Sequence, residues 1–274
     1  MLSSATAPAL LGAPALSGVF GAGSVNAVLA LREAERSLPR SLAALEREPA
    51  TARAFAAFER AVARADSPEA LLEDPQARRF LAMALGVPEA AETPALFIRA
   101  MLSDPSQPDS LVSRLADRRL SAAAATLKFA SQGLASVRDS EIVATLKRGW
   151  VRATQFERLR TRDPALVDAL VFKEQANAAA NSTFAVLGHP ILRRVVTTVL
   201  GLPMELAVQS VEAQARAINQ RFDVSRLSDP RFVQRFAERY LARAQGATDA
   251  AGAAASPMSL FSPALAPGRL SLVL

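Results

Sequence analysis

A cluster of basic residues in the middle of the chain is the strongest candidate for a charged binding site. Trp150 lies among six basic side chains: Lys147, Arg148, Arg152, Arg158, Arg160 and Arg162. Such a group could neutralise nucleic-acid phosphates while the indole stacks on a base. However, Trp150 continues the helical spacing of Ile142 and Leu146, and Glu157 and Asp163 are close enough in sequence to pair with the arginines. We therefore predict that Trp150 is buried and that the cluster faces solvent or a protein. Nucleic acid is the less favoured partner.

The residues needed for catalysis or metal binding are scarce. His189 is the only histidine and stands directly before Pro190, where it suits the start of a helix better than catalysis. Cysteine is absent, which excludes disulfides, thiolate zinc sites and cysteine nucleophiles. The carboxylates lack the spacing of a calcium loop, and the glycines form no phosphate-binding motif. The sequence therefore predicts neither an enzyme nor a cofactor or metal site.

Composition favours helices as the elements that position these residues. Of the 274 residues half are apolar, alanine and leucine dominate, and no stretch alternates like a strand for long. The net charge is +6, and residues 1–130 are balanced at 14 basic and 14 acidic side chains. The basic excess therefore belongs to the second half of the chain. It could meet an anionic partner such as nucleic acid, a membrane surface or an acidic protein.

Both ends of the chain are rich in Ala, Ser, Pro and Gly. We expect residues 1–23 and 246–274 to be disordered tails that flank a helical domain at residues 24–245. The N-terminal stretch carries no charge before Arg32. Its prolines and glycines argue against a membrane-spanning helix, and the missing basic residue argues against a cleaved signal peptide. Within the domain, Pro39 and Pro49 mark helix breaks or first turns. Residues 131–139 are the best candidate for a linker.

A motif repeats within the domain at an offset of 115 residues. The stretch DPQARRFLAMALGVP begins at Asp74, and HPILRRVVTTVLGLP begins at His189. A proline suits the first helical turn, and a glycine in the left-handed conformation can end the helix, after which a second proline prevents its restart. The matching residues of the first copy are Pro75, Arg78, Arg79, Gly86 and Pro88, and those of the second are Pro190, Arg193, Arg194, Gly201 and Pro203.

A second motif repeats further along, as VSRLADRR before residue 120 and VSRLSDPR before residue 232. Asp117 and Asp229 stand where a helix cap is expected. Two motifs in the same order predict an internal duplication, with copies at about residues 65–130 and 180–245 joined by residues 131–179. The predicted fold is an all-α, multihelical bundle whose two similar halves share a core. The paired arginines, kept in both copies beside helix starts, are interpreted as partners of nearby carbonyls or carboxylates.

These motifs, together with the segments FIRAMLSDPSQPDSLVSRLADRRLSAAAATLKFA and IVATLKRGWVRATQFERLRTRDPALVDALVFKEQA, resemble a family. It is the bacterial domain-of-unknown-function family numbered twelve-seventeen. Its members occur mainly in alphaproteobacteria, often encoded among flagellar genes. The resemblance covers about residues 28–245, and the segment DALVFKEQA departs from the family pattern.

The resemblance implies an all-helical, duplicated fold and a flagellum-associated role, and it supplies no catalytic residues. We therefore expect a non-enzymatic protein that acts through contacts with flagellar proteins in flagellar structure, assembly or motility. Its expected location is the flagellum or the bacterial cytoplasm, and export without a cleaved signal peptide stays open. The alternative is a nucleic-acid or anionic-surface binding protein that uses the basic second half.

Overall fold

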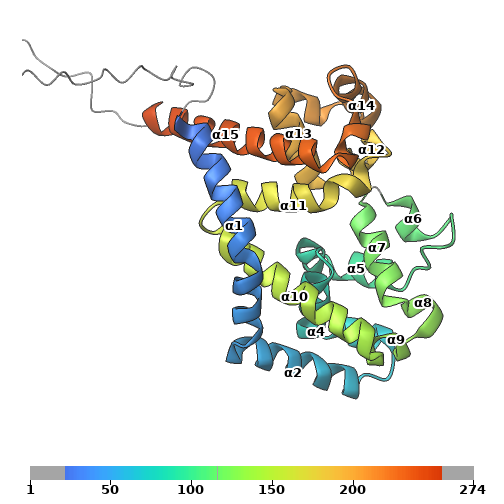
Figure 1. The fold of residues 1–274 in the computed structure, drawn as a ribbon. Coiled ribbons are helices and arrows are strands. Elements are labelled where there is room, and N and C mark those ends of the chain that lie inside the picture. Colours follow the sequence, from blue (N-terminus) through green and yellow to red (C-terminus); the bar gives the residue numbers. More distant parts are fainter. Residues whose placement is uncertain (1–21, 116, 255–274) are drawn as a thin grey trace, which may run out of the picture.

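The computed structural model describes residues 22–115 and 117–254, and Figure 1 shows an arrangement of helices over this range. These residues form no strand, so the all-α class expected from composition is confirmed. Two long helices, α1 (Ala22–Glu46) and α10 (Ser140–Arg160), connect two groups of mostly shorter ones. We call residues 49–138 the N-terminal half and residues 164–254 the C-terminal half.

Each half is a series of helices that mostly begin at a proline or behind a capping side chain. Those of the N-terminal half are α2 (Pro49–Arg64), α3 (Pro68–Glu73), α4 (Pro75–Ala84), the 3₁₀ helix η1 (Pro88–Glu92), α5 (Pro94–Met101), α6 (Leu111–Arg114), α7 (Arg118–Leu127), α8 (Phe129–Gln132) and α9 (Ala135–Arg138). Those of the C-terminal half are α11 (Pro164–Ala179), α12 (Thr183–Leu187), α13 (Pro190–Leu200), the 3₁₀ helix η2 (Met204–Val208), α14 (Val211–Asn219), the 3₁₀ helix η3 (Val224–Ser228) and α15 (Pro230–Ala254).

The two copies of the first repeated motif end their helices with the same hydrogen bonds. After α4, the Val87 amide donates to the Ala82 carbonyl at 2.9 Å, and after α13 the Leu202 amide donates to the Thr197 carbonyl at 3.0 Å. The glycine between these partners has a positive φ in both places, 75° at Gly86 and 62° at Gly201. A residue with a side chain is strained in this conformation, which explains why both copies of the motif have glycine at this position. Descent of the two halves from one ancestral segment stays a prediction.

The apolar side chains form two buried clusters, and the shared core that we expected is wrong. One cluster gathers residues of α2–α9, such as Phe97 and Leu127, and takes Leu146 from α10. The other gathers residues of α11–α15 and takes Leu31 from α1 and Phe156 from α10. Helix α10 therefore spans both cores, because opposite ends of one helix bury side chains in different halves.

Helix α10 crosses α4 at very short range. A Cβ atom at Gly149 would lie 2.1 Å from the carbonyl oxygen of Ala84, a separation that real Cβ contacts do not show. Nearby, Trp150 packs on Phe80 with their ring centroids 5.9 Å apart and on Phe55 with centroids 5.7 Å apart. Trp150 therefore packs against the apolar cluster as its spacing indicated, but it is half-buried and not fully buried as we predicted.

Three local expectations need correction. Pro39 lies inside α1 and does not break it, because Leu31 and Leu45 on either side are fully buried and packing holds the helix together. Residues 131–139 are no loose linker: they contain α9, and Ser136 and Val137 are buried. Helix α15 continues to Ala254, past the expected boundary at residue 245.

The remaining expectations about the chain ends concern residues 1–21 and 255–274, which lie outside the part of the chain that the structure describes. Across residues 22–115 and 117–254, no helix has the length and apolar character that crossing a bilayer requires.

Candidate functional site

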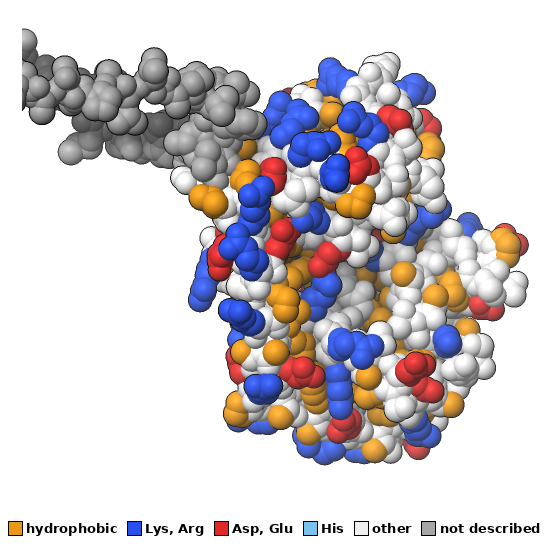
Figure 2. Space-filling model, viewed as in Figure 1, with side chains coloured by type: hydrophobic (Ala, Val, Ile, Leu, Met, Phe, Trp, Pro, Cys, Tyr) orange, Lys and Arg blue, Asp and Glu red, His pale blue; other side chains and the backbone are white. Residues whose placement is uncertain are grey.

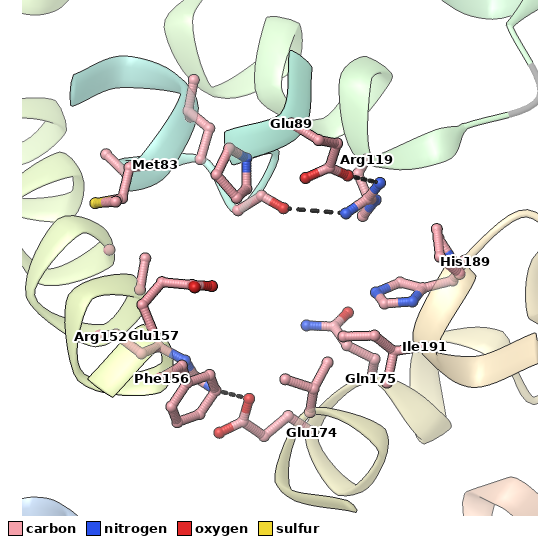
Figure 3. A pocket seen from close by; sticks show the side chains of 18 of the residues that line it. Met83, Glu89, Arg119, Arg152, Phe156, Glu157, Glu174, Gln175, His189 and Ile191 are labelled. Carbon is pink, nitrogen blue, oxygen red and sulfur yellow. Dashed lines mark hydrogen bonds and ion pairs between the residues drawn. The ribbon is translucent and has the colours of Figure 1, made fainter. Parts of the chain in front are cut away.

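A cleft of about 640 Å³ lies between the two halves (Figure 3). Helix α10 lines one side with Gly149, Arg152, Ala153, Phe156, Glu157 and Arg160. The other lining residues come from both halves: Met83–Gly86, Pro88, Glu89, Arg119 and Ala122 of the N-terminal half, and Val171, Glu174, Gln175 and His189–Ile191 of the C-terminal half. The two copies of the repeated motif thus meet at one cavity, the first with its helix end and the second with its helix start.

Arg119 of α7 fixes the N-terminal wall of the cleft. Its guanidinium donates to both Asp117 carboxylate oxygens and to the Gly86 carbonyl at 3.3 Å. It also donates to the Glu89 carboxylate (Figure 3). Burial by itself would lower the pKa of Arg119, but Asp117 and Glu89 outweigh it and raise the pKa. The side chain therefore clamps the α4–η1 turn to α7 as a permanent cation.

His189 stands on the opposite wall and caps α13. Its Nδ1 accepts a hydrogen bond from the Leu192 amide at 3.4 Å, which bears out the expected role at a helix start. Burial lowers the pKa of His189, and the positive charge of Arg119 lowers it further. The imidazole is therefore neutral at pH 7 and carries its proton on Nε2, since Nδ1 acts as an acceptor.

The arginines of α10 at the cleft are already paired. Arg152 forms an ion pair with Glu174 and lies over the Phe156 ring, 4.8 Å from its centroid. Burial lowers the pKa of Arg152. Arg160 contacts Glu157 at 3.4 Å. These arrangements leave the cleft with apolar surface and balanced charge.

The rest of the predicted basic cluster does not form one continuous surface. Lys147 pairs with Glu59 at 2.7 Å, and Arg148 donates to the Thr145 hydroxyl at 3.0 Å. Arg158 binds both carboxylate oxygens of Glu48 at 2.7 Å, which lowers the pKa of that glutamate. Arg162 is exposed, without a side-chain partner in the described part. Acidic residues therefore pair with four of the six basic residues, and three of these pairs join segments distant in the sequence.

The arginines of the repeated motif take different roles in the two halves. Arg78 donates to the Leu72 and Glu73 carbonyls at 3.0 and 3.1 Å, whereas its counterpart Arg193 is exposed. The other pair of counterparts, Arg79 and Arg194, also differ. Arg79 is exposed, without a side-chain partner in the described residues. Arg194 donates to Asp168 at 2.6 Å. The caps Asp117 and Asp229 agree, since each accepts a backbone hydrogen bond at 2.9 Å from the residue two positions on.

Asp168 is the centre of a buried polar network beside the cleft. Its side chain is only 1% exposed and accepts hydrogen bonds from Arg194, from Arg160 at 3.4 Å and from the Tyr240 hydroxyl at 3.0 Å. Burial raises the pKa of Tyr240, and the neighbouring Asp168 carboxylate raises it further. These contacts join α10, α11, α13 and α15. Sequence reasoning missed Asp168, although a single charge within the apolar run of α11 was a usable signal.

Sequence reasoning also missed the roles of Glu89 and Glu174, because their partners Arg119 and Arg152 come from other elements. Among the described residues, no group of three or more His, Asp or Glu side chains is arranged to hold a metal ion. Nor does the cleft bring a serine hydroxyl next to His189. The geometry suits the binding of a ligand or a protein segment.

Comparison with known proteins identifies the family of this helical, two-cored fold. The model of the family described as "Protein of unknown function (DUF1217)" matches residues 84–233, more than half of the chain. The chain belongs to this family, as its motifs indicated. A search of curated proteins gave no match.

A solved structure supports the same fold. The crystal structure of a protein from Agrobacterium tumefaciens superposes with a TM-score of 0.70 at 20% sequence identity, covering 81% of this chain and 94% of that one. At this identity the likeness concerns the fold alone.

Proposed function

We propose that this protein is a non-enzymatic, flagellum-associated component that acts through protein contacts in flagellar structure, assembly or motility. The flagellar part rests on membership of the family, whose genes are often found among flagellar genes. It implies partners among flagellar proteins, met either in the cytoplasm or after export.

A single observation favours binding over catalysis: the charged side chains of the cleft are occupied by one another. Arg119 is held by Asp117 and Glu89, and Arg152 is held by Glu174. Catalytic groups commonly combine a reactive side chain with a neighbouring base and an unoccupied space beside both. Here the ion pairs fix the walls, and the space between them offers shape and apolar surface to a partner segment.

Deletion of the gene, scored for swimming in soft agar, tests this proposal. We expect reduced swimming that is restored by an intact copy of the gene. A fluorescently tagged protein should gather at the sites where flagella are attached. A fully motile deletion strain with evenly distributed tagged protein would refute the flagellar role.

A second experiment tests the role of the cleft. Ala153 lines the cavity, so Ala153→Trp should fill it with an aromatic side chain. Ala125, an exposed residue of α7 that does not line the cleft, provides the matched control Ala125→Trp. If the cleft receives a partner, only the first variant should fail to restore swimming while keeping the helical circular dichroism of the wild type. Equal restoration by two folded variants would exclude the cleft as a contact.

A further inference from the structure

The C-terminal half carries a group of exposed arginines, of which only Arg194 is paired with a carboxylate of the described residues. Figure 2 shows Lys and Arg side chains gathered over the part of the molecule where Figure 1 places α13 and α15. On these two helices six arginines are exposed: Arg193, Arg194, Arg231, Arg235, Arg239 and Arg243. We call this set the arginine surface. As far as residue 246, these helices carry one acidic residue, Glu238, and its carboxylate accepts from Gln234.

Four of these arginines form a regular row. Residues 231, 235, 239 and 243 of α15 are four apart, so their side chains follow one another along one ridge, about 6 Å from each to the next. At the end of the row Arg243 donates to the Thr198 carbonyl of α13 at 3.0 Å. Arg194 of the same helix is fixed by Asp168. The row therefore adjoins α13 at its Arg243 end, where Arg243 and Arg194 are held by the fold.

These cations differ from the other basic residues in being grouped on two neighbouring helices that carry a single acidic residue as far as residue 246. The basic residues of α10 are mostly satisfied, for instance Arg158 by Glu48 and Lys147 by Glu59. In contrast, the side chains of Arg231, Arg235 and Arg239 contact no carboxylate within the described residues. Residues 180–245 hold nine arginines against five acidic residues, whereas residues 65–130 hold seven basic and nine acidic ones. The unmatched positive charge is therefore concentrated on one side of one half.

The shape around α15 decides between classes of anionic partner. Helix α15 packs on α1, α11 and α13, so it forms part of a packed layer. A duplex is usually read by a helix that protrudes far enough to enter the major groove, which this layer does not allow. Single strands need exposed aromatic rings for stacking. The rings of this region, Phe232, Phe236 and Tyr240, are all buried.

We propose that the arginine surface binds an acidic helix of a protein partner, with carboxylates four residues apart matched to the row on α15. Such a helix presents its charges at the same spacing of about 6 Å. Each guanidinium can bind a carboxylate through two parallel hydrogen bonds, which fixes the register as well as the affinity. This inference deepens the proposed function. Its restriction to a protein partner rests on that function.

The test measures binding of a labelled peptide to the purified full chain by fluorescence anisotropy. The probe is an alanine-based helical peptide with glutamate at every fourth position. A second peptide of equal charge has its glutamates distributed around the helix. We expect the first peptide to bind more tightly. Its affinity should fall steeply as salt is raised from 50 to 200 mM, because the Debye length is about halved over this interval.

Two triple variants with the same change in net charge locate the site. Arg231→Glu, Arg235→Glu and Arg239→Glu together should weaken binding at least about tenfold, since each removes an attraction and adds a repulsion. The matched control is Arg53→Glu, Arg60→Glu and Arg99→Glu, three exposed arginines of the N-terminal half. It should change affinity by less than about twofold. Circular dichroism melting should show that both variants stay folded, because all six positions are exposed.

Three results would overturn the proposal. The first is that the peptide with glutamate at every fourth position does not bind at 50 mM salt. The second is that the two triple variants weaken binding equally. The third is that a 20-base-pair DNA duplex or phosphatidylserine vesicles bind more tightly than the peptide. A motile deletion strain would instead refute the flagellar role and leave this binding result unchanged, so the two failures are distinguishable.

Discussion

The two halves of the molecule use the same signals to end helices and differ in how they treat charge. Helices α2 and α11 both begin at a proline and are 16 residues long, and α4 and α13 end at glycines with matching hydrogen bonds. In the N-terminal half, Arg119 is enclosed by carboxylates. In the C-terminal half, a row of arginines remains exposed. The comparison teaches that the same local signals fix backbone geometry in both halves, while the arrangement of exposed charge differs between them.

The largest expected effect belongs to a network found only in the C-terminal half. Asp168→Ala should lower the free energy of unfolding by about 3 kcal/mol, because it removes a buried carboxylate and leaves the Tyr240 hydroxyl without its acceptor. Chemical unfolding by guanidinium measures the change. Glu157→Ala is the control, since Glu157 contacts the same Arg160 but is about half exposed, and it should cost less than about 0.5 kcal/mol. Equal costs would show that Asp168 is not the centre of the network.

The contact of α10 with the N-terminal half gives the next effect. Gly149→Ala should cost about 2 kcal/mol, because the new Cβ would overlap the Ala84 carbonyl and force α10 away from α4. Gly246→Ala, also inside a long helix, has free space around the added atom and should be neutral or stabilising by up to about 1 kcal/mol. Thermal melts of the two variants should therefore shift in different directions. A shared upward shift would contradict the close crossing.

The equivalence of the two helix ends can be tested directly. Gly86→Ala and Gly201→Ala should each cost about 1 kcal/mol, since both glycines have positive φ. Denaturant midpoints measured side by side give the comparison. A cost in only one half would mean that the repeated motif has kept its role in one copy alone.

The smallest effect is a pH dependence that only one half should show. The fold holds the pKa of His189 below its ordinary value of 6.5, so the unfolded chain binds the proton more readily. This contribution to stability is complete above pH 6.5 and is lost as the pH falls below that value. His189→Asn keeps a capping side chain and removes the titration. Unfolding at pH 7.5 and 5.5 should differ less in this variant than in the wild type, and an unchanged difference would refute the assignment.

Local signals allowed the sequence to predict much of the fold. The starts at Pro75 and Pro190, the ends at Gly86 and Gly201, and the caps at Asp117 and Asp229 depend on neighbouring residues, so they can be predicted from the local sequence. The expected break at Pro39 was wrong, because tertiary packing of α1 outweighs the tendency of proline to interrupt a helix.

The cleft and the charge distribution depend on contacts that are distant in sequence. Glu48 and Arg158 are separated by 110 residues, so no local pattern indicated that they would neutralise each other. For the same reason, the expected basic surface was placed on α10, whereas the structure groups six exposed arginines on α13 and α15. Which cations remain available to a partner is a property of the folded chain.

The central claim, that function depends on what distinguishes the C-terminal half, is tested most directly by complementation. A strain lacking the gene would receive the wild type, the triple α15 variant at Arg231, Arg235 and Arg239, or the charge-matched variant at Arg53, Arg60 and Arg99, and swimming diameter in soft agar would be measured at equal protein levels. We predict that the wild type and the N-terminal variant restore swimming and that the α15 variant does not. Full restoration by the α15 variant would contradict the account.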